Sequence, residues 1–478
     1  MRRRGSTLLV LLPLSLLLLG AAAAQARAQG LTLGFSADSA LTSGNAAAQS
    51  IWIPRAAAEG AGIIRVNVIW SQVAPATRPA GFVASDPSSP GYNWTAVDAA
   101  VRTISSHGLR VLLNVWGAPT WAEGPGMPGS AGAGTWKPDP SQFGAFATAL
   151  ARRYDGHFPD PLAPGAFLPR VTDFQAWNEP NLDVYLTPQW TRAGAHYVPS
   201  SPVIYRGLLN AFYAAVKGVS SFNFVVAAGT APYGDPPGGD RIPPVEFDRV
   251  LFCLAGNAKL TPLSCPDPPH LDAVSHHPYG IEGPLWHALN PDDAAVPDIY
   301  KIANVLHAAV RDHHVLPRGP KQIWVTEISW DSSPPDPQGV PIQQQARWLE
   351  QSFYVLWSQG VSTILWLQIV DSPPIPSYAT TYQAGLYYLS GAAKPAAQSF
   401  RFPFVTKRVD SGHVYAWGRA PAIGWVSIEI LRRGRWVVLH RQRVATNQLF
   451  WSTLAVRGNA VFRAQLGSQT SLAWTQRR

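Results

Sequence analysis

Eight stretches of the sequence are almost continuously apolar and rich in β-branched or aromatic residues. Such runs are typical of strands that flanking helices bury on both faces. Between the runs, several segments repeat apolar positions every three or four residues, which predicts amphipathic helices. The runs begin near Leu31, Gly62, Leu109, Val171, Phe222, Leu271, Lys321 and Val361, and the clearest helical patterns cover 94–107, 141–154, 201–219, 297–313 and 342–359.

This alternation of strand and helix predicts an α/β fold, and eight such units are what a (β/α)8 TIM barrel needs. A doubly wound open sheet is the alternative. Such a sheet normally carries a Gly-rich phosphate-binding loop after its first strand. The segment after the first run reads FSADSALTSGN and contains no loop of that kind, which favours the barrel.

The pattern changes after about Ser399. Short runs that alternate apolar and polar residues, separated by Gly turns, now follow one another. They predict a small antiparallel β-sandwich. We therefore expect a barrel over residues 29–398 and a β domain over 399–478. Two Pro-rich segments, 332–341 and 371–378, follow the seventh and eighth runs and are expected at the rim of the barrel.

Residues 1–28 have the layout of a secretory signal peptide. Three Arg precede a Leu-rich run, and small residues follow it, with cleavage expected after Ala26 or Ala28. An uncleaved anchor is the alternative, but the run is short for a membrane span of about 20 residues. No later segment is apolar enough to cross a membrane. We expect a secreted, extracellular protein.

The chain has two cysteines, Cys253 and Cys265. In an exported chain this even count predicts one disulfide. The bridge would close the loop before the sixth strand and is expected to steady the turn at 277–279. No further cysteine completes a set of four metal ligands, and the paired histidines lack the spacing of a metal site. We therefore expect no metal and no cofactor.

The formal net charge of +9 is unevenly distributed. Residues 401–478 carry 13 basic and 2 acidic side chains, a net charge of +11. A basic tail domain could contact an acidic polymer, a cell wall or a membrane surface. The alternative, which we favour at this point, is an ordinary solvated face in an Arg-rich protein. An exported chain without a nucleic-acid motif is not expected to bind nucleic acid, and nothing in the sequence indicates the oligomeric state.

Two glutamates stand at the ends of predicted strands. The fourth run ends in Asn178-Glu179-Pro180, and the seventh carries Glu327. Barrel enzymes place their chemistry at the carboxyl ends of strands, and a carboxylate at the edge of a core is costly unless it is paired, hydrogen-bonded or used. Two such carboxylates are the groups that glycoside hydrolysis needs. One protonates the leaving oxygen, and the other attacks the anomeric carbon or activates water.

The sequence WNEP at the end of the fourth run, with a second Glu at the end of the seventh, resembles the clan A glycoside hydrolases, families 5 and 39 in particular. The resemblance covers roughly residues 31–400. It implies a retaining β-glycosidase on a (β/α)8 barrel that acts on a carbohydrate. The residue roles that it implies are Glu179 as general acid/base, Glu327 as nucleophile, Asn178 on the sugar 2-hydroxyl, Arg65 keeping Glu327 ionised, His277 near the nucleophile, Tyr279 hydrogen-bonded to Glu327, and Trp366 beneath the first sugar.

The chain departs from these families after its third strand, where many members carry a His. Here the sequence reads LLNVWGAPTWA, so Asn114 or Trp116 is expected to take that place. Asp371, after the eighth strand, is a further candidate for contact with substrate. Further candidate sugar platforms are Trp70, Trp121, Trp136 and Trp330.

Two other functions remain open at this level. One is a non-catalytic carbohydrate-binding or cell-wall-associated barrel. The presence of both glutamates with Asn178, Tyr279 and Arg65 argues against it, because binding alone needs neither an acid nor a nucleophile. The other is a transglycosidase that uses the same two glutamates, which only product analysis separates from a hydrolase.

Overall fold

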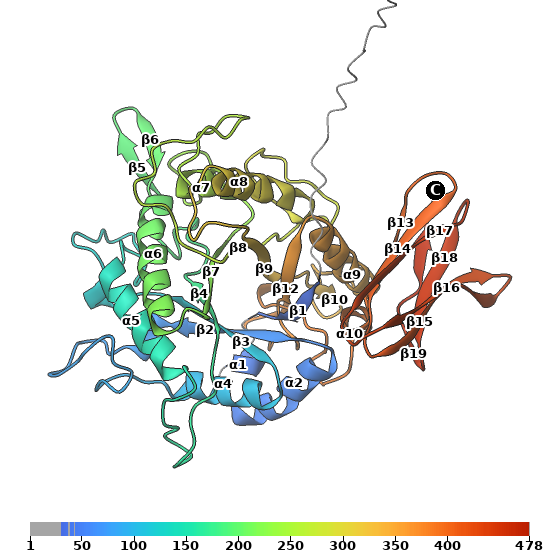
Figure 1. Cartoon of the computed structure of the whole chain (residues 1–478), viewed down its shortest axis with the longest axis horizontal. Helices are drawn as coiled ribbons and strands as arrows, with labels where there is room; N and C mark the ends of the chain where they lie inside the picture. The colour runs from blue at the N-terminus through green and yellow to red at the C-terminus, as the bar shows by residue number, and fades with distance from the viewer. Residues whose placement is uncertain (1–29, 37–38, 43, 478) are drawn as a thin grey trace, which may run out of the picture.

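A computed structural model gives the structure of the chain and describes residues 30–36, 39–42 and 44–477. The predicted signal segment, 1–28, lies outside these residues. The described part consists of a barrel ringed by helices and a β domain packed against one side of it (Figure 1). None of its helices has the length and apolar character that a membrane crossing requires.

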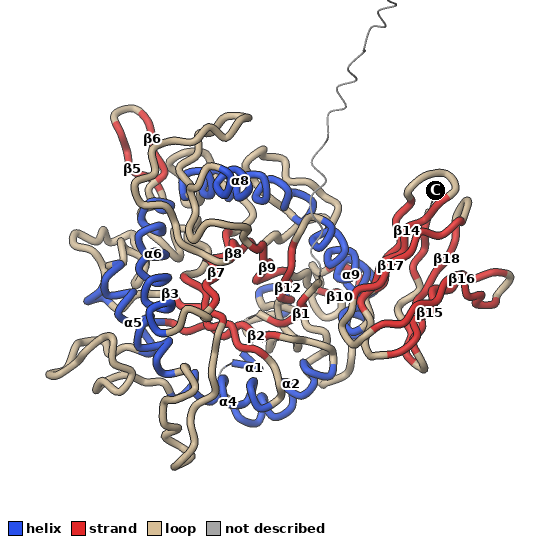
Figure 2. The backbone as a smooth tube through the Cα atoms, in the orientation of Figure 1, coloured by secondary structure: helices blue, strands red, loops and turns tan. Residues whose placement is uncertain are grey.

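Eight parallel strands of the described chain close into a barrel (Figure 2). Each strand pairs with the next along the chain, and β1 pairs with β12 to complete the circle. The prediction of a TIM barrel is therefore confirmed, and all eight apolar runs form its strands. The strands are β1 Thr32–Phe35, β2 Ile63–Ile69, β3 Arg110–Trp116, β4 Asp173–Ala176, β7 Phe224–Thr230, β8 Ala273–His276, β9 Gln322–Ile328 and β12 Val361–Trp366.

Helices cover the outside of the barrel (Figure 2). α5 shows why they form where they do. The Asp139 side chain accepts hydrogen bonds from the first free N–H groups, Pro140 occupies the first turn, and Phe143 and Phe146 are buried. The helices are α1 Ser39–Thr42, α2 Ala46–Ala58, α3 Trp70–Val73, α4 Thr95–Ser106, α5 Pro140–Arg153, α6 Ser201–Val219, α7 Pro244–Leu251, α8 Ile299–Arg311, α9 Ile342–Ser358 and α10 Pro395–Arg401.

Long connections follow the carboxyl ends of several barrel strands and form the rim. A hairpin of β5 (Trp190–Ala193) and β6 (His196–Pro199) follows β4. A short parallel pair, β10 (Ser332–Ser333) and β11 (Val340–Pro341), follows β9. The Pro-rich segment 332–341 follows β9, and the Pro-rich segment 371–378 follows β12. Both therefore belong to rim connections, as the sequence predicted.

The C-terminal domain is made of two antiparallel sheets that enclose one apolar core. Its fold agrees with the predicted β-sandwich. One sheet has the order β13-β14-β17, and the other has the order β16-β15-β18-β19, with β20 pairing β18. The strands are β13 Phe404–Arg408, β14 His413–Arg419, β15 Gly424–Arg432, β16 Arg435–Val444, β17 Leu449–Ala455, β18 Ala460–Leu466, β19 Gln469–Thr470 and β20 Trp474–Gln476.

The β domain packs on α9 of the barrel. The rings of Trp357 and Trp417 lie 5.5 Å apart, and the buried Arg419 donates to the carbonyl of Gly60 at 2.8 Å. The expected boundary at 398/399 falls inside α10, where Phe400 stacks on Phe35 of β1 with centroids 4.8 Å apart. We propose that α10 belongs to the barrel and that the β domain begins at β13.

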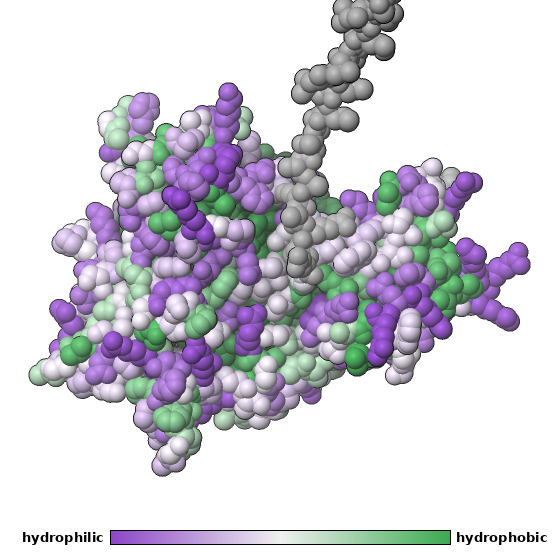
Figure 3. Space-filling model, in the orientation of Figure 1, coloured by the Kyte–Doolittle hydropathy of each residue, from purple (hydrophilic) through white to green (hydrophobic). Residues whose placement is uncertain are grey.

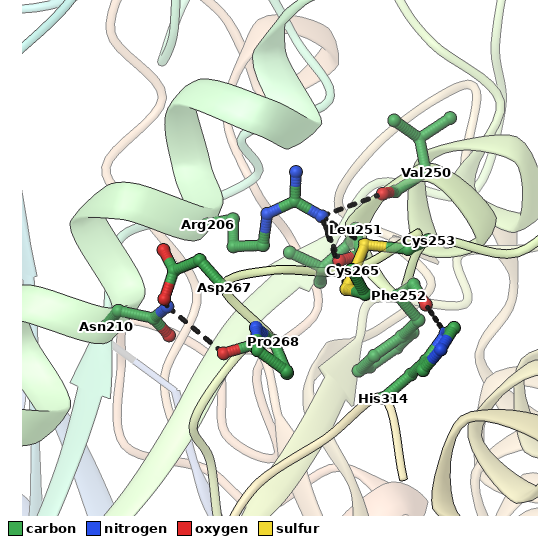
Figure 4. The surroundings of a disulfide bond; sticks show 10 residues. All are labelled: Arg206, Asn210, Val250, Leu251, Phe252, Cys253, Cys265, Asp267, Pro268 and His314. Atoms are coloured by element: carbon green, nitrogen blue, oxygen red, sulfur yellow. Dashed lines mark hydrogen bonds between the residues drawn. A yellow bond between two sulfur atoms is a disulfide. The ribbon is translucent and has the colours of Figure 1, made fainter. Parts of the chain in front are cut away.

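Cys253 and Cys265 form the predicted disulfide, with their Cα atoms 5.6 Å apart. Figure 4 shows Arg206 reaching from α6 to the bridge, where its Nη1 donates to the carbonyl of Leu251 at 3.1 Å and to Cys253 Sγ at 2.7 Å. The bridge lies between α7 and the start of β8. It is therefore at the amino end of the strand, whereas the turn at 277–279 follows the carboxyl end, so the bridge does not steady that turn directly.

Candidate active site

The backbone is strained where Glu179 leaves β4. Trp177 and Glu179 have φ angles of +75° and +34°, values that residues other than glycine rarely adopt. The Glu179 N–H donates to the carbonyl of Gly229 in β7 at 3.0 Å, and the Trp177 indole donates to the carbonyl of Tyr185 at 2.9 Å. These bonds hold the carboxylate at the barrel mouth. Such strain is common where function fixes a side chain.

Glu327, at the carboxyl end of β9, is held by two donors. The Arg65 guanidinium, from β2 and fully buried, forms an ion pair with Oε1. The Tyr279 hydroxyl donates to Oε2 at 3.0 Å. Both contacts are those that the sequence resemblance implied. The side chain of Glu327 keeps 17% of its surface exposed, and that of Glu179 keeps 12%, so both carboxylates remain reachable from solvent.

The surroundings of Glu327 favour its ionised form. Burial raises the pKa of this carboxyl, but the His277 ring, the Arg65 guanidinium and the Tyr279 hydroxyl outweigh burial and hold the pKa below its usual value. Burial and the neighbouring carboxylates raise the pKa of Tyr279, so its hydroxyl stays protonated and can donate. Glu327 is thus prepared to act as an anion.

His277 follows β8 and lies between the two glutamates. Its Nδ1 is 2.8 Å from Glu179 Oε1 and 3.8 Å from Glu327 Oε2. The ring can lie there only because Gly229 has no side chain. A Cβ at that position would come within 2.2 Å of His277 Nε2. The site therefore depends on a glycine in the neighbouring strand.

A chain of buried hydrogen bonds joins the two halves of the site. Arg65 Nε donates to Gln175 Oε1 at 2.8 Å, and Gln175 Nε2 donates to Thr326 Oγ1 at 3.2 Å. Thr326 Oγ1 is in turn 2.9 Å from His277 Nε2. If the Thr326 hydroxyl donates to Nε2, then Nδ1 carries the proton and donates to Glu179. The network therefore couples the cation beside Glu327 to the imidazole beside Glu179.

Glu179, His277 and Glu327 bring two carboxylate oxygens and one ring nitrogen within 4.8 Å of one another, a set that could hold a metal ion. Arg65 already forms an ion pair with the Glu327 carboxylate, and the guanidinium would repel a metal ion bound to that carboxylate. The arrangement therefore fits proton transfer and nucleophilic attack better than metal binding.

The remaining predicted contacts lie around this centre. Asn178 Oδ1 accepts from Arg65 Nη2 at 2.6 Å, which leaves the Nδ2 group of Asn178 for a ligand. Asn114 is fully buried in β3. In the amide orientation that satisfies its neighbours, it accepts from Arg65 and donates to the carbonyl of Trp177. Trp116 is half-buried at the end of β3, edge-on to Tyr185 with centroids 5.2 Å apart.

Two sequence assignments need correction. Trp366 is fully buried and donates to the carbonyl of Ala384 at 2.8 Å, so no face of its ring is free to lie beneath a sugar. Asp371 is 2% exposed and forms an ion pair with the buried Lys394 at 2.5 Å. Its carboxylate therefore fixes the connection after β12 to the start of α10 and does not face a substrate.

Of the four candidate sugar platforms, two are buried and two are partly exposed. Trp70 is fully buried and Trp330 is 6% exposed, whereas Trp121 and Trp136 are half-buried in the connection after β3. Sequence reasoning missed two tyrosines near the glutamates. The carboxylates of Glu179 and Glu327 add to burial in raising the pKa values of Tyr185 and Tyr382. For Tyr185 a signal existed, because it stands in the connection directly after WNEP.

No protein-family model and no curated protein sequence matches this chain. Solved structures do match. A family 39 glycoside hydrolase from the gut symbiont Bacteroides cellulosilyticus WH2 is 17% identical, with a TM-score of 0.53 over 90% of this chain and 81% of that chain. This chain shares its barrel fold with that glycoside hydrolase.

Two further solved structures resemble this chain. A monomeric β-xylosidase from Caulobacter crescentus CB15 is 15% identical, with a TM-score of 0.49 over 90% of this chain and 96% of that chain. A glucosidase from Croceicoccus marinus is 11% identical, with a TM-score of 0.48 over 90% of this chain and 94% of that chain. At such identities the likeness concerns the fold, and the chemistry has to be inferred from the site itself.

Proposed function

We propose that the chain is a secreted retaining β-glycosidase that hydrolyses the O-glycosidic bonds of a poly- or oligosaccharide. The observation that carries this proposal is the pair of glutamates at the ends of β4 and β9, with one oxygen of each within 4.8 Å of the other. Retaining enzymes hold their carboxyl groups about 5 to 5.5 Å apart, and inverting enzymes about 6.5 to 9.5 Å. The short separation supports double displacement.

The unlike partners of the two carboxylates support their different roles. In the first step, Glu327 attacks the anomeric carbon and the bond to the leaving oxygen breaks, while Glu179 gives that oxygen a proton. Arg65 and Tyr279 support Glu327 as an anion. In the second step, Glu179 takes a proton from water, and the water oxygen displaces Glu327 from the sugar.

His277 and Asn178 assist in this scheme. In this scheme Nδ1 of His277 carries a proton and donates to Oε1 of Glu179, and the catalytic proton is then on the other oxygen. Asn178, whose amide oxygen is held by Arg65, presents its Nδ2 group to the sugar 2-hydroxyl. The predicted signal segment and the disulfide support secretion, because disulfides persist in oxidising compartments.

The test compares Glu179→Ala and Glu327→Ala on a panel of aryl β-glycosides with activated leaving groups, with and without azide. Glu327→Ala should be inactive without azide, and any product formed with azide should be the α-glycosyl azide, because azide then attacks the anomeric carbon directly. Glu179→Ala should still form the glycosyl-enzyme, because the leaving group needs no proton, and azide should restore turnover with a β-glycosyl azide as product. If Glu179→Ala gains nothing from azide while Glu327→Ala yields a β-glycosyl azide, the roles are reversed. If both variants keep the activity of the parent, the site lies elsewhere.

A further inference from the structure

The outer face of the sheet formed by β16, β15 and β18 carries a hollow of about 520 Å³. It belongs to the β domain, away from the barrel mouth. Figure 3 shows hydrophilic side chains projecting from the outer tip of the β domain, beside an apolar area. We call this feature the Trp425 hollow, and the residues that line it are Trp425, Ser427, Glu429, Arg441, Gln465 and Gly467.

Strand alternation explains why polar groups line this face. Val426, Ile428 and Ile430 of β15 point into the core of the sandwich. The residues between them therefore point outward. Cross-strand pairing then places Arg441 of β16 and Gln465 of β18 on either side of Ser427. The hollow is thus a row of polar side chains across three strands.

The floor of the hollow is fixed by hydrogen bonds. Glu429 is 7% exposed and accepts from Arg463 Nε at 2.7 Å. The Arg463 guanidinium lies 4.3 Å from the centroid of the Trp436 ring. Arg441 Nε donates to Ser427 Oγ at 3.0 Å. These bonds orient the guanidinium of Arg441 at the edge of the hollow.

Two groups in the hollow are free to take a ligand. Within the described part of the chain, the Nη groups of Arg441 have no hydrogen-bond or ion-pair partner. Trp425 is 63% exposed. An exposed indole offers a flat apolar face, and a guanidinium fork fits a carboxylate with two parallel hydrogen bonds. The pair suits a ring that carries a carboxylate.

The excess positive charge of the β domain as a whole favours an anionic ligand. The β15–β16 hairpin also carries exposed arginines that form no ion pair within the described residues, whereas Glu429 and Asp410 are the only acids of residues 401–478. Such an excess of positive charge attracts polyanions and raises their local concentration. The unpaired arginines are Arg432, Arg433, Arg435 and Arg443.

We propose that the Trp425 hollow binds a uronate residue of an acidic polysaccharide. Trp425 stacks on the pyranose ring, and the Nη groups of Arg441 bind its carboxylate. The choice of a glycan over other polyanions rests on the proposed glycosidase function. The β domain would then hold a polymer whose other residues reach the barrel, and it would do so without any part in bond cleavage.

The test uses the full chain in the Glu179→Gln background, so that the polymer is not consumed. Affinity electrophoresis should show retardation by polygalacturonate and at least about tenfold weaker binding to the fully methyl-esterified polymer, which keeps the ring but lacks the charge. Trp425→Ala and Arg441→Gln should each weaken binding by about tenfold. Trp425→Phe, which keeps a ring, should bind nearly as well as the parent.

Arg457→Gln is the matched control. It removes one exposed positive charge outside the hollow and should change binding by less than about twofold. The proposal is overturned if polygalacturonate is not bound, or if Trp425→Ala and Arg441→Gln bind like Arg457→Gln. Equal retardation by inorganic polyphosphate would also overturn it, because that polyanion has no sugar ring.

The two proposals fail separately. With Glu179 and Glu327 intact, Trp425→Ala should cleave small aryl β-glycosides at the rate of the parent chain. If the parent chain has no glycosidase activity, the proposed function is wrong, but the binding measurement remains valid. If the parent chain is active but does not bind polygalacturonate, the binding proposal is wrong and the proposed function remains.

Discussion

Glu179 and Glu327 are the same residue type at one barrel mouth, and their neighbours make them different. Arg65 and Tyr279 contact Glu327, whereas the imidazole of His277 is the direct partner of Glu179. In the proposed mechanism, a pair of chemically identical groups acquires two roles from the residues around them. Each role can be probed by removing one neighbour at a time.

Tyr279→Phe should move the acidic limb of the pH–activity profile to higher pH. The hydroxyl lowers the pKa of Glu327, so removing it raises that pKa, and Glu327 is then protonated at a higher pH than in the parent. In the proposed mechanism Glu327 must be ionised to attack, so activity is lost at a higher pH than in the parent as the pH falls. At pH 7, kcat/KM should fall by about tenfold. Tyr213→Phe, on the outer helix α6, serves as control, and an unmoved acidic limb in Tyr279→Phe would contradict the assignment.

At the scale of the secondary-structure elements, the site depends on close approach between strands. Gly229 of β7 accepts from the Glu179 backbone and leaves space for the His277 ring after β8. Three neighbouring strands therefore meet at one residue that has no side chain. A methyl group there would disturb both the backbone partner and the imidazole partner of Glu179.

Gly229→Ala should lower kcat by about 100-fold, because a displacement of about 1 Å at a reacting group can cost that much. The new Cβ would lie 2.2 Å from His277 Nε2, so the imidazole must move. The free energy of unfolding should fall by only about 1 to 3 kcal/mol. Gly218→Ala, on α6 with open space around it, is the control and should leave kcat unchanged. Steady-state kinetics and thermal unfolding check both, and parental kcat in Gly229→Ala would refute the role of this contact.

The strands of the barrel were predictable because each is an apolar run bounded by polar segments. The sequence did not predict α2, because Pro54 interrupts its helical pattern and its many alanines define no clear apolar face. Position at a strand end identified Glu179 and Glu327 but misplaced Asp371. Its partner Lys394 lies 23 residues further along the chain, and only folding brings the two together. The hydrophobic pattern likewise could not show that Trp366 is buried, because its burial depends on tertiary packing.

For the whole molecule, the contact between barrel and β domain contains a buried acid. Glu350 of α9 is fully buried, accepts from Arg347 Nη1 at 2.8 Å and lies beside the backbone of Phe404, where the β domain begins. Burial raises the pKa of Glu350 to about 8, although Arg347 counteracts it. The interface therefore holds a proton that the unfolded chain would release.

Glu350→Gln should flatten the dependence of stability on pH. Between the ordinary pKa of Glu, about 4.3, and about 8, the folded parent keeps the proton and the unfolded chain loses it, so rising pH favours unfolding. The Gln variant cannot titrate, and at pH 8 it should be more stable than the parent by on the order of 1 kcal/mol. Calorimetry from pH 5 to 8 measures this. The exposed Glu282→Gln is the control, and a Tm curve for Glu350→Gln that runs parallel to that of the parent would contradict the prediction.

The disulfide and the two glutamates lie at opposite ends of the same barrel. Cys253–Cys265 joins segments at the amino end, near the start of β8, while the carboxylates stand beyond the carboxyl ends of β4 and β9. Mutation and selection can therefore act on one end without disturbing the other. The rim loops are free to diverge toward a new sugar while the amino end of the barrel continues to resist unfolding. A designer who seeks greater heat tolerance can work at the amino end without cost to turnover.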